Sequence, residues 1–370
     1  MRERTLADRL LRWFARHRRD LPWRREPRDP YRVWLAEVML QQTQVTTVVP
    51  YYERWLERFP TLEALAAAPL DAVLKLWEGL GYYARARNLH AAARAVVQTH
   101  GGRIPATVEG LLRLPGVGRY TAGAIASLAF NANAPTLDGN VKRVLSRVHG
   151  LSAPKEDELW RLAESLLPPG RAGAFNEALM DLGATVCTPR APQCPTCPLR
   201  TLCVAQASGD PEAYPARLRK KSTPHHQVIT AVIVDEAGRV LLGQRPPDGL
   251  LGGLWEFVSS ELRTSSNSNG EDAFGSGSSA PLKRMIVTRT GLHIGRADIA
   301  PLGEVKHAFT HFRITRRAWL VRLATRCHAT LQPKGYGRLL WASPAEVESL
   351  ALTRSDQKIW QMYRNTTTGS

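Results

Sequence analysis

Leu114-Pro115-Gly116-Val117-Gly118 is the stretch that decides the fold of the first half of this chain. On both sides of it, in 108–114 and 120–130, apolar residues recur every three or four positions, which is the spacing of amphipathic helices. The glycines permit a tight turn, and the N–H groups that open the second helix have no partner within it. Residues 111–130 therefore predict a helix-hairpin-helix that binds backbone phosphate without reading sequence. An ordinary turn is the alternative.

The charge of the chain indicates a polyanionic partner. Its 370 residues include 50 Lys and Arg against 33 Asp and Glu, a formal net charge of +17. This excess favours nucleic acid, although a merely basic surface would have the same composition. No run of about 18 apolar residues occurs, so we expect no contact with a membrane. Four of the five cysteines fall within 17 residues, unlike a secreted disulfide scaffold, and we expect a cytoplasmic protein.

The hydrophobic period divides the chain into domains. Helical spacing continues through residues 1–215 and predicts an all-α domain. Residues 216–227, in a stretch rich in Pro, Ala and basic residues, read as a linker. From 228 the period becomes two and predicts a second, α/β domain over 228–362.

Within this domain 264–279, rich in Ser, Gly and Asn, reads as a disordered loop. Phe312 to Leu323 reads as a strand or hairpin, and Ser343 to Glu346 as a capping box that opens a late helix. Residues 363–370 should form a loose tail.

Glu37 is a carboxylate where a buried helix should have none. Asp29-Pro30 supplies a cap and a first-turn proline, so a helix is expected to begin there. At helical spacing the neighbours of Glu37 are Val33, Trp34 and Leu40, which places the acid inside the apolar stripe. Such an acid resists ionisation at neutral pH. A hydrogen bond or salt bridge at the edge of the stripe is the alternative.

Asp138 has the opposite surroundings. It stands just before a helical pattern formed by Val141, Val144, Leu145 and Val148, where it can cap the helix. The positive end of that helix would hold the carboxylate ionised. We therefore expect the surroundings of Glu37 and Asp138 to shift their protonation in opposite directions, as in a pair that divides acid and anion roles. Capping alone is the plainer interpretation.

Leu80-Gly81-Tyr82-Tyr83 interrupts the helical pattern and is followed by Arg85 and Arg87. Aromatic and basic residues on such a turn suit insertion into a base stack beside phosphates. A buried corner between two helices is equally compatible with the pattern.

Cys187, Cys194, Cys197 and Cys203 form a C-x6-C-x2-C-x5-C array with prolines between them. Four thiolates in one short segment can hold a [4Fe-4S] cluster or a zinc ion. Structural zinc usually comes with two separated C-x2-C pairs, so the unequal run over 187–203 favours iron and sulfur. Cys327 lies far away and reads as a plain buried thiol.

Four motifs in this order resemble the helix-hairpin-helix DNA glycosylase superfamily: Glu37 to Val45, Leu114 to Gly123, Leu137 to Arg143 and the cysteine array. With the second domain, the resemblance is to the MutY-type adenine DNA glycosylase family. It implies a multidomain fold, with an all-α glycosylase domain that carries a [4Fe-4S] loop and an α/β Nudix-like domain. It also implies a monomer that acts on double-stranded DNA, in a bacterial-type, nucleoid-associated setting.

The resemblance assigns roles to individual residues. Glu37 would protonate adenine and Asp138 would stabilise the sugar cation, while Tyr120, Asn140 and Glu177 match other active-site positions. We expect DNA contacts from residues of the Gln42 segment, the Leu80 turn, the hairpin and the helix after Asp138: Gln42, Leu80, Gly81, Tyr82, Arg85, Gly116, Val117, Gly118 and Lys142. The related endonuclease III branch has a nucleophilic lysine after the hairpin. Here Tyr120 follows Arg119, and a phenol cannot form an imine with the sugar.

The second domain resembles a Nudix fold through Val240 to Arg245 and Gly252 to Phe257. The two adjacent acids of the Nudix box are replaced here by Thr288-Arg289. Because hard divalent cations need those carboxylates, we expect that the domain has kept the Nudix fold and lost its hydrolytic activity. Phe309-Thr310-His311 matches the tip with which the family inspects 8-oxoguanine. The resemblance thus implies excision of adenine mispaired with 8-oxoguanine or guanine. A bifunctional lyase, a nucleotide phosphohydrolase and a non-catalytic damage-binding protein are the rivals.

Overall fold

The computed structural model describes residues 2–216, 223–262, 279–295, 297–309, 312–324 and 331–368. The chain divides into two compact units. The first contains Met1–Ala68 and Asn88–Lys220, and the second contains Pro69–Arg87 and Lys221–Ser370. The boundary predicted near residue 215 therefore misses an insertion, because Pro69–Arg87 groups with the C-terminal part. No helix in the described ranges is long and apolar enough to cross a membrane.

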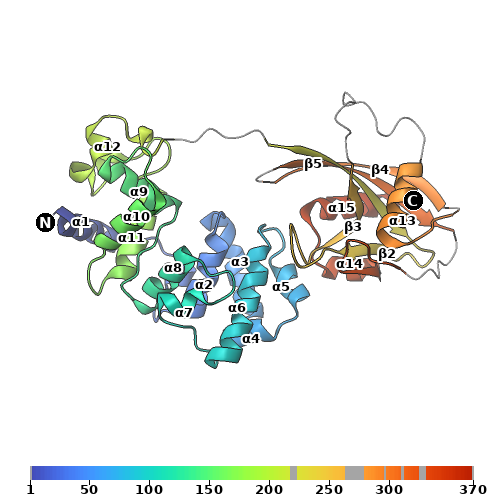
Figure 1. The fold of residues 1–370 in the computed structure, drawn as a ribbon, viewed down its shortest axis with the longest axis horizontal. Helices are drawn as coiled ribbons and strands as arrows, with labels where there is room; N and C mark the ends of the chain where they lie inside the picture. Colours follow the sequence, from blue (N-terminus) through green and yellow to red (C-terminus); the bar gives the residue numbers. More distant parts are fainter. Residues whose placement is uncertain are drawn as a thin grey trace. The chain divides into compact units, whose positions relative to one another are not determined.

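The first unit is helical, as expected (Figure 1). Its helices are α1 (Arg2–His17), α2 (Pro30–Leu40), α3 (Val45–Arg58), α4 (Leu62–Ala67), most of α6 (Ala84–His100), α7 (Val108–Leu112), α8 (Arg119–Phe130), α9 (Gly139–His149), α10 (Glu156–Ser165), α11 (Ala172–Thr185) and α12 (Val204–Ala207). Helix α5 (Leu70–Leu76) belongs to the second unit. Apolar faces of α1, α9, α10 and α11 form one core cluster.

Helix α2 is the most enclosed element of the first unit. It starts where the sequence predicts, with the Asp29 carboxylate accepting hydrogen bonds from the N–H groups of Tyr31 (2.8 Å) and Arg32 (3.3 Å). Residues 33–39 are all buried, so the helix is covered on every side rather than along one stripe. It packs against α8, the second helix of the hairpin motif. A carboxylate on this helix is therefore removed from water.

The second unit contains a six-stranded sheet in the order β4-β5-β1-β3-β2-β6. The strands are β1 (His225–Val234), β2 (Val240–Gln244), β3 (Trp255–Glu261), β4 (Ala297–Ala308), β5 (Arg313–Leu323) and β6 (Arg338–Ala342). Only the β1–β5 pair is parallel among the described strands. Its helices are α5, the start of α6, α13 (Ala280–Thr290), α14 (Pro344–Ser349) and α15 (Arg354–Thr368).

Alternating residues of β1 explain the layers of this sheet. Ile229, Ala231 and Ile233 pack in the cluster that includes α13, whereas Val232 and Val234 pack in the cluster that includes α15. Since side chains alternate across a strand, β1 is buried on both faces. The sheet lies between the two helices (Figure 1). The α/β prediction for this domain is confirmed.

Several local predictions can be compared with the structure. The Ser343 capping box is present, with reciprocal bonds to Glu346. The linker prediction over 216–227 is wrong at its end, because β1 begins at His225 and pairs there with Arg313. The tail prediction over 363–370 is wrong for 363–368, which continue α15, with Tyr363 packed in the core cluster. The predicted loop 264–279 lies outside the described residues except for Ser279.

Candidate active site and cysteine loop

A cavity of about 1040 Å³ opens in the first unit. Its walls come from α2, the segment after α2, the hairpin and the start of α9. Glu37, Tyr120, Asp138 and Asn140 all line it. The structure therefore brings together four side chains that lie up to 103 positions apart in the sequence, counted from 37 to 140.

Glu37 is 4% exposed and accepts a 2.6 Å hydrogen bond at Oε2 from the Tyr120 hydroxyl. Burial raises the pKa of Glu37 to about 7, and the nearby Asp138 and Glu177 carboxylates act in the same direction. The Tyr120 hydrogen bond and Arg24 oppose the rise of this pKa. The two interpretations of Glu37 from the sequence are therefore compatible: the carboxyl group is hydrogen-bonded, and it still resists ionisation.

Asp138 caps α9 as the sequence predicts. Its Oδ1 accepts from the Val141 N–H at 2.7 Å, and its Oδ2 accepts from Asn140 Nδ2 at 3.0 Å. The expectation that its surroundings lower its pKa is wrong, because burial outweighs these hydrogen bonds and raises the pKa of Asp138. The two carboxylates still differ. Asp138 accepts from two N–H donors, which favour the anion, whereas Glu37 accepts from a single phenol.

Glu177 lies on α11 and lines, together with Glu37, a second and smaller cavity rather than the large one. The Arg28 guanidinium donates to both of its oxygens at 3.0 Å, and Arg24 pairs with it at 3.0 Å. Arg24 also bonds Asp181, one helical turn farther along α11. Sequence reasoning missed these arginines and Asp181. The sequence did contain an indication of them, because Glu177 and Asp181 lie four positions apart in an otherwise apolar helix and so share one face.

Arg143 is a second residue that sequence reasoning did not place in the site. Its guanidinium lines the cavity and donates to Asn140 Oδ1 at 2.8 Å. The same side chain donates to the backbone carbonyls of Gly183 (2.7 Å) and Cys187 (2.8 Å). Arg143 therefore fixes the amide that contacts Asp138.

The hairpin has the backbone geometry that its glycines suggest. Gly116 has a φ of +71°, and a Cβ there would lie 2.4 Å from the Cβ of Asn88. Gly118 stands at the start of α8, and both glycines line the cavity. Val117 is buried and does not line the cavity. Lys142 does not line it either, because its ammonium pairs with Glu156 at 3.1 Å.

The candidate DNA-contacting turns differ from each other in exposure. Gln42 lines the cavity with a φ of +58°. Leu80, which opens the turn proposed for insertion, is 6% exposed, and Arg85 is buried with its guanidinium bonded to the carbonyls of Leu80 and Gly81. The choice of Leu80 and Arg85 is therefore not supported by the structure. Tyr82 is 39% exposed and is the side chain that this turn presents.

The four cysteines of the array line one small cavity beside α9. Arg147 of α9 donates to Cys187 Sγ (3.4 Å) and to the Thr188 carbonyl (2.7 Å), while its own carbonyl accepts from Cys203 Sγ (3.4 Å). Thiols and a cationic N–H donor around one space form a donor set that suits an anionic sulfur-ligated group. In the described part of the chain, no three His, Cys, Asp or Glu are grouped closely enough to hold a metal ion. Cys327 lies outside the described residues.

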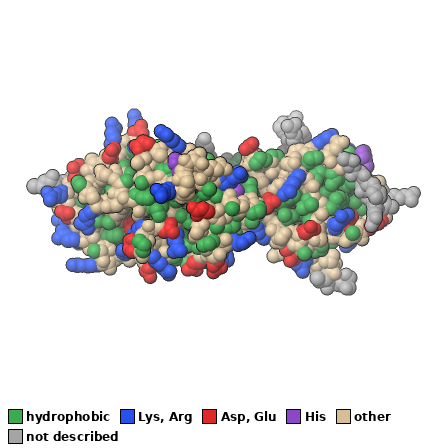
Figure 2. Space-filling view, turned by 90° about the horizontal axis from the view of Figure 1, so that it is seen from below, with side chains coloured by type: hydrophobic (Ala, Val, Ile, Leu, Met, Phe, Trp, Pro, Cys, Tyr) green, Lys and Arg blue, Asp and Glu red, His purple; other side chains and the backbone are tan. Residues whose placement is uncertain are grey.

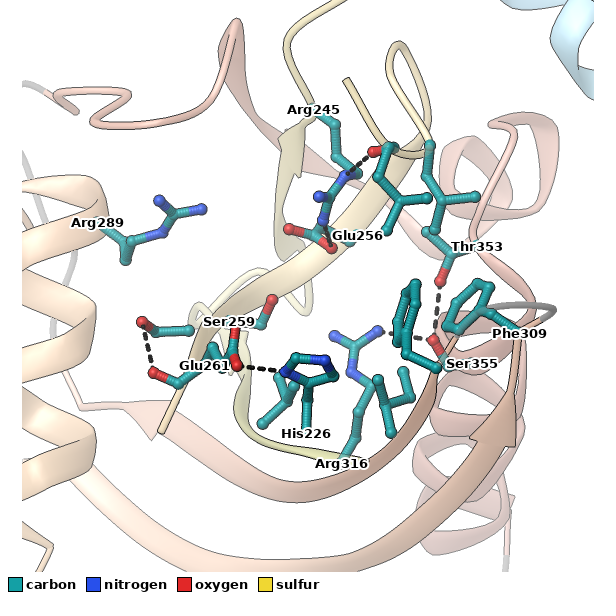
Figure 3. Close-up of a pocket in the computed structure, with 16 residues that line it drawn as sticks. His226, Arg245, Glu256, Ser259, Glu261, Arg289, Phe309, Arg316, Thr353 and Ser355 are labelled. Atoms are coloured by element: carbon teal, nitrogen blue, oxygen red, sulfur yellow. Dashed lines mark hydrogen bonds and ion pairs between the residues drawn. The ribbon is translucent and has the colours of Figure 1, made fainter. Parts of the chain in front are cut away.

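The C-terminal domain has its own pocket of about 430 Å³. Figure 3 shows Phe309, Arg316 and Glu256 around it. Phe309 stacks on Phe312 with ring centroids 4.5 Å apart. Thr310 and His311 lie outside the described residues. Where the Nudix acids would stand, the Arg289 guanidinium lies over the Tyr336 ring at 4.3 Å.

On one face of the molecule, basic side chains are spread out rather than gathered in one patch. Figure 2 shows Lys and Arg interspersed with Asp and Glu on the face drawn there.

Residues 35–169 match the HhH-GPD superfamily base excision DNA repair protein family, and residues 229–362 match the NUDIX domain family. A human protein named adenine DNA glycosylase is 36% identical, with the match covering 98% of this chain and 74% of its own. One from Mycolicibacterium smegmatis is 44% identical over 56% of this chain and 72% of its own. The solved structure of a thermostable thymine-DNA glycosylase is 34% identical with a TM-score of 0.52, covering 56% of this chain and 97% of that one.

The fold and site thus define a helix-hairpin-helix base excision DNA repair protein with an added Nudix-type domain. Within that class, the chain belongs to the adenine DNA glycosylase family.

Proposed function

We propose that this chain is a monofunctional DNA glycosylase that hydrolyses the N-glycosidic bond of adenine mispaired with 8-oxoguanine or guanine. The observation that carries the proposal is the buried Glu37, whose pKa burial raises to about 7 and which lines one cavity with Asp138 and the hairpin glycines. The relatives named adenine DNA glycosylase support adenine as the excised base.

The residues divide the reaction between them. Adenine that has left the base stack enters the cavity, and Glu37 donates its proton to N7, which makes the base a better leaving group. The bond between C1′ and N9 breaks with its electron pair going to the base, and Asp138 stabilises the oxocarbenium ion. Water adds to C1′ and releases a proton, so that adenine and an abasic site result.

Among the described residues that line the cavity, none is a lysine whose amine could attack the sugar. Tyr120 occupies the position of the lysine nucleophile, and the ammonium of Lys142 pairs with Glu156 outside the cavity. An imine intermediate, and hence efficient strand cleavage, is therefore not expected.

The cysteine loop is proposed to hold a [4Fe-4S] cluster through Cys187, Cys194, Cys197 and Cys203. When bound, the cluster would order this loop next to α9. Anaerobically purified protein should contain iron and acid-labile sulfide in equal amounts. Zinc without sulfide would contradict the assignment. Arg147→Ala should lower the iron content, because it removes the donor to Cys187 and Thr188.

The C-terminal domain is proposed to inspect the base opposite adenine through Phe309, Thr310 and His311. Phe309 is half-buried directly after β4 and stacks on Phe312, so a base that stacks there would extend an existing aromatic pair. Localisation in the bacterial cytoplasm and action as a monomer belong to the same proposal.

One assay addresses substrate and lyase activity together. Duplexes with A:8-oxoguanine, A:G or thymine glycol are incubated with the protein and divided into samples with and without hot alkali. Cleavage of both adenine duplexes only after alkali is the expected result. Strand cleavage without alkali, or a borohydride-trapped adduct, would favour the lyase rival. Binding without any cleavage would favour a non-catalytic damage-binding protein.

A further inference from the structure

The segment Pro69–Arg87 carries the exposed Tyr82, yet it groups with the C-terminal domain. The lesion-inspecting domain and the turn proposed to enter the duplex therefore belong to one unit. The contacts that join them reach several places in the C-terminal domain.

Asp71 of α5 makes the first contact. Its Oδ1 accepts from Gln244 Nε2 at 3.0 Å, and its Oδ2 accepts from an Arg338 Nη at 2.7 Å. Arg338 also donates to Gln244 Oε1 at 2.8 Å, so the three side chains close a hydrogen-bonded ring. The Asp71 and Arg338 side chains are 37% and 56% exposed, and such a pair alone stabilises little.

Glu78 makes the second contact, closer to the turn. Its Oε1 accepts from the backbone N–H of Leu352 at 2.8 Å, and its Oε2 pairs with Lys75 at 3.0 Å. Lys75 in turn donates to the Leu350 carbonyl. The Glu78 side chain is only 15% exposed, so this contact is better shielded from solvent than the one at Asp71.

Between these anchors and Tyr82 the chain is internally braced. Trp77 is fully buried, and its Nε1–H donates to the Gly81 carbonyl at 3.0 Å. The Arg85 guanidinium lies over the rings of Trp77 and Tyr82 and donates to the carbonyls of Leu80 and Gly81. Because these contacts brace the turn, we expect a displacement at Asp71 or Glu78 to reach Tyr82.

We propose that Asp71 and Glu78 are positioning residues that hold the Tyr82 turn to the C-terminal domain, so that recognition of the base opposite adenine sets the insertion of Tyr82. This inference rests on the proposed function. It predicts that the two acids matter for the A:8-oxoguanine substrate and much less for A:G, where the C-terminal domain has no oxidised base to bind.

The test compares single-turnover adenine release from A:8-oxoguanine and A:G duplexes, with 2-aminopurine beside the mispair to report unstacking. Asp71→Ala/Glu78→Ala should lower the A:8-oxoguanine rate about tenfold, a usual size for coupling between two sites, and reduce the fluorescence rise. The A:G rate should stay within about twofold. Tyr82→Ala should lose the fluorescence rise on both duplexes.

Two further variants separate positioning from folding. Glu78→Gln keeps an oxygen that accepts from the Leu352 N–H and should restore the 8-oxoguanine preference, whereas Glu78→Ala should not. Asp157→Asn, an exposed acid of α10, is the matched control and should change neither rate. Equal losses on both duplexes, or an unchanged preference and fluorescence, would overturn the coupling. If the wild-type chain showed no 8-oxoguanine preference, the proposed substrate would fail, and the fluorescence of the double variant would still decide the coupling.

Discussion

The hydroxyl of Tyr120 donates a 2.6 Å hydrogen bond to Oε2 of Glu37, joining the first turn of α8 to the middle of α2. Tyr120 stands at the position where the related endonuclease III branch has its nucleophilic lysine, so this contact involves a phenol instead of an amine. It also opposes the effect of burial on the pKa of Glu37. The pair therefore affects both the type of reaction and its pH dependence.

The first prediction concerns the alkaline limit of activity. Because the pKa of Glu37 is raised to about 7, the single-turnover rate of adenine release should decline above that pH as the proton is lost. Tyr120→Phe removes a hydrogen bond that lowers this pKa, so the decline should begin at higher pH. Rate-against-pH profiles of the two proteins check this. If the alkaline decline of the rate began at the same pH in both proteins, Glu37 would not be the titrating acid.

The second prediction concerns stability and follows from the same pKa. Glu37 in the unfolded chain loses its proton near the ordinary value of 4.5, whereas in the folded chain it does so at about 7. The folded state therefore binds more protons between these values and loses stability as the pH rises. Glu37→Gln should abolish excision, retain duplex binding, and unfold at higher urea concentration than wild type at about pH 8 but not at about pH 4. A variant that excises adenine would refute the role of Glu37.

The third prediction uses the contact between Gly183 and Asn140. A Cβ at Gly183 would lie 2.6 Å from the Cβ of Asn140 and 3.1 Å from its Cα. Gly183→Ala must displace Asn140, which donates to Asp138, and should lower the single-turnover rate about tenfold or more. Gly295→Ala, where a Cβ meets nothing within 4 Å, is the control. A variant with normal activity would show that the Asn140 contact is dispensable.

The fourth prediction separates the two hairpin glycines. Gly116 has a φ of +71° and faces Asn88, whereas Gly118 has a φ of −90° and open space for a Cβ. Gly116→Ala should weaken affinity for undamaged duplex about tenfold, since left-handed backbone costs an alanine roughly 1–2 kcal/mol. Gly118→Ala should have little effect. Fluorescence anisotropy at fixed salt measures both, and equal affinities would argue against a strained phosphate-binding turn.

Some features could be predicted because they depend on neighbours in the sequence. Asp29-Pro30 starts α2 through its own side chain and ring, and the apolar spacing around Glu37 is enough to indicate its burial. The Ser343 box and the alternation along β1 are likewise local. Each of these signals acts within one helical turn or one strand, so a single sequence contains the whole of it.

Other features depend on residues that are distant in the chain. Sequence spacing could not show that Leu80 is buried while Tyr82 is exposed, or that Arg24 and Arg28 neutralise Glu177. The direction of the Asp138 pKa was mispredicted for the same reason, because capping is local whereas desolvation comes from surrounding elements. By itself, the sequence determined the family and the helix-hairpin-helix, and it singled out Glu37 as the candidate acid. Only the tertiary structure decided which side chains share the cavity and which residues join Pro69–Arg87 to the C-terminal domain, because burial and pairing depend on the whole fold.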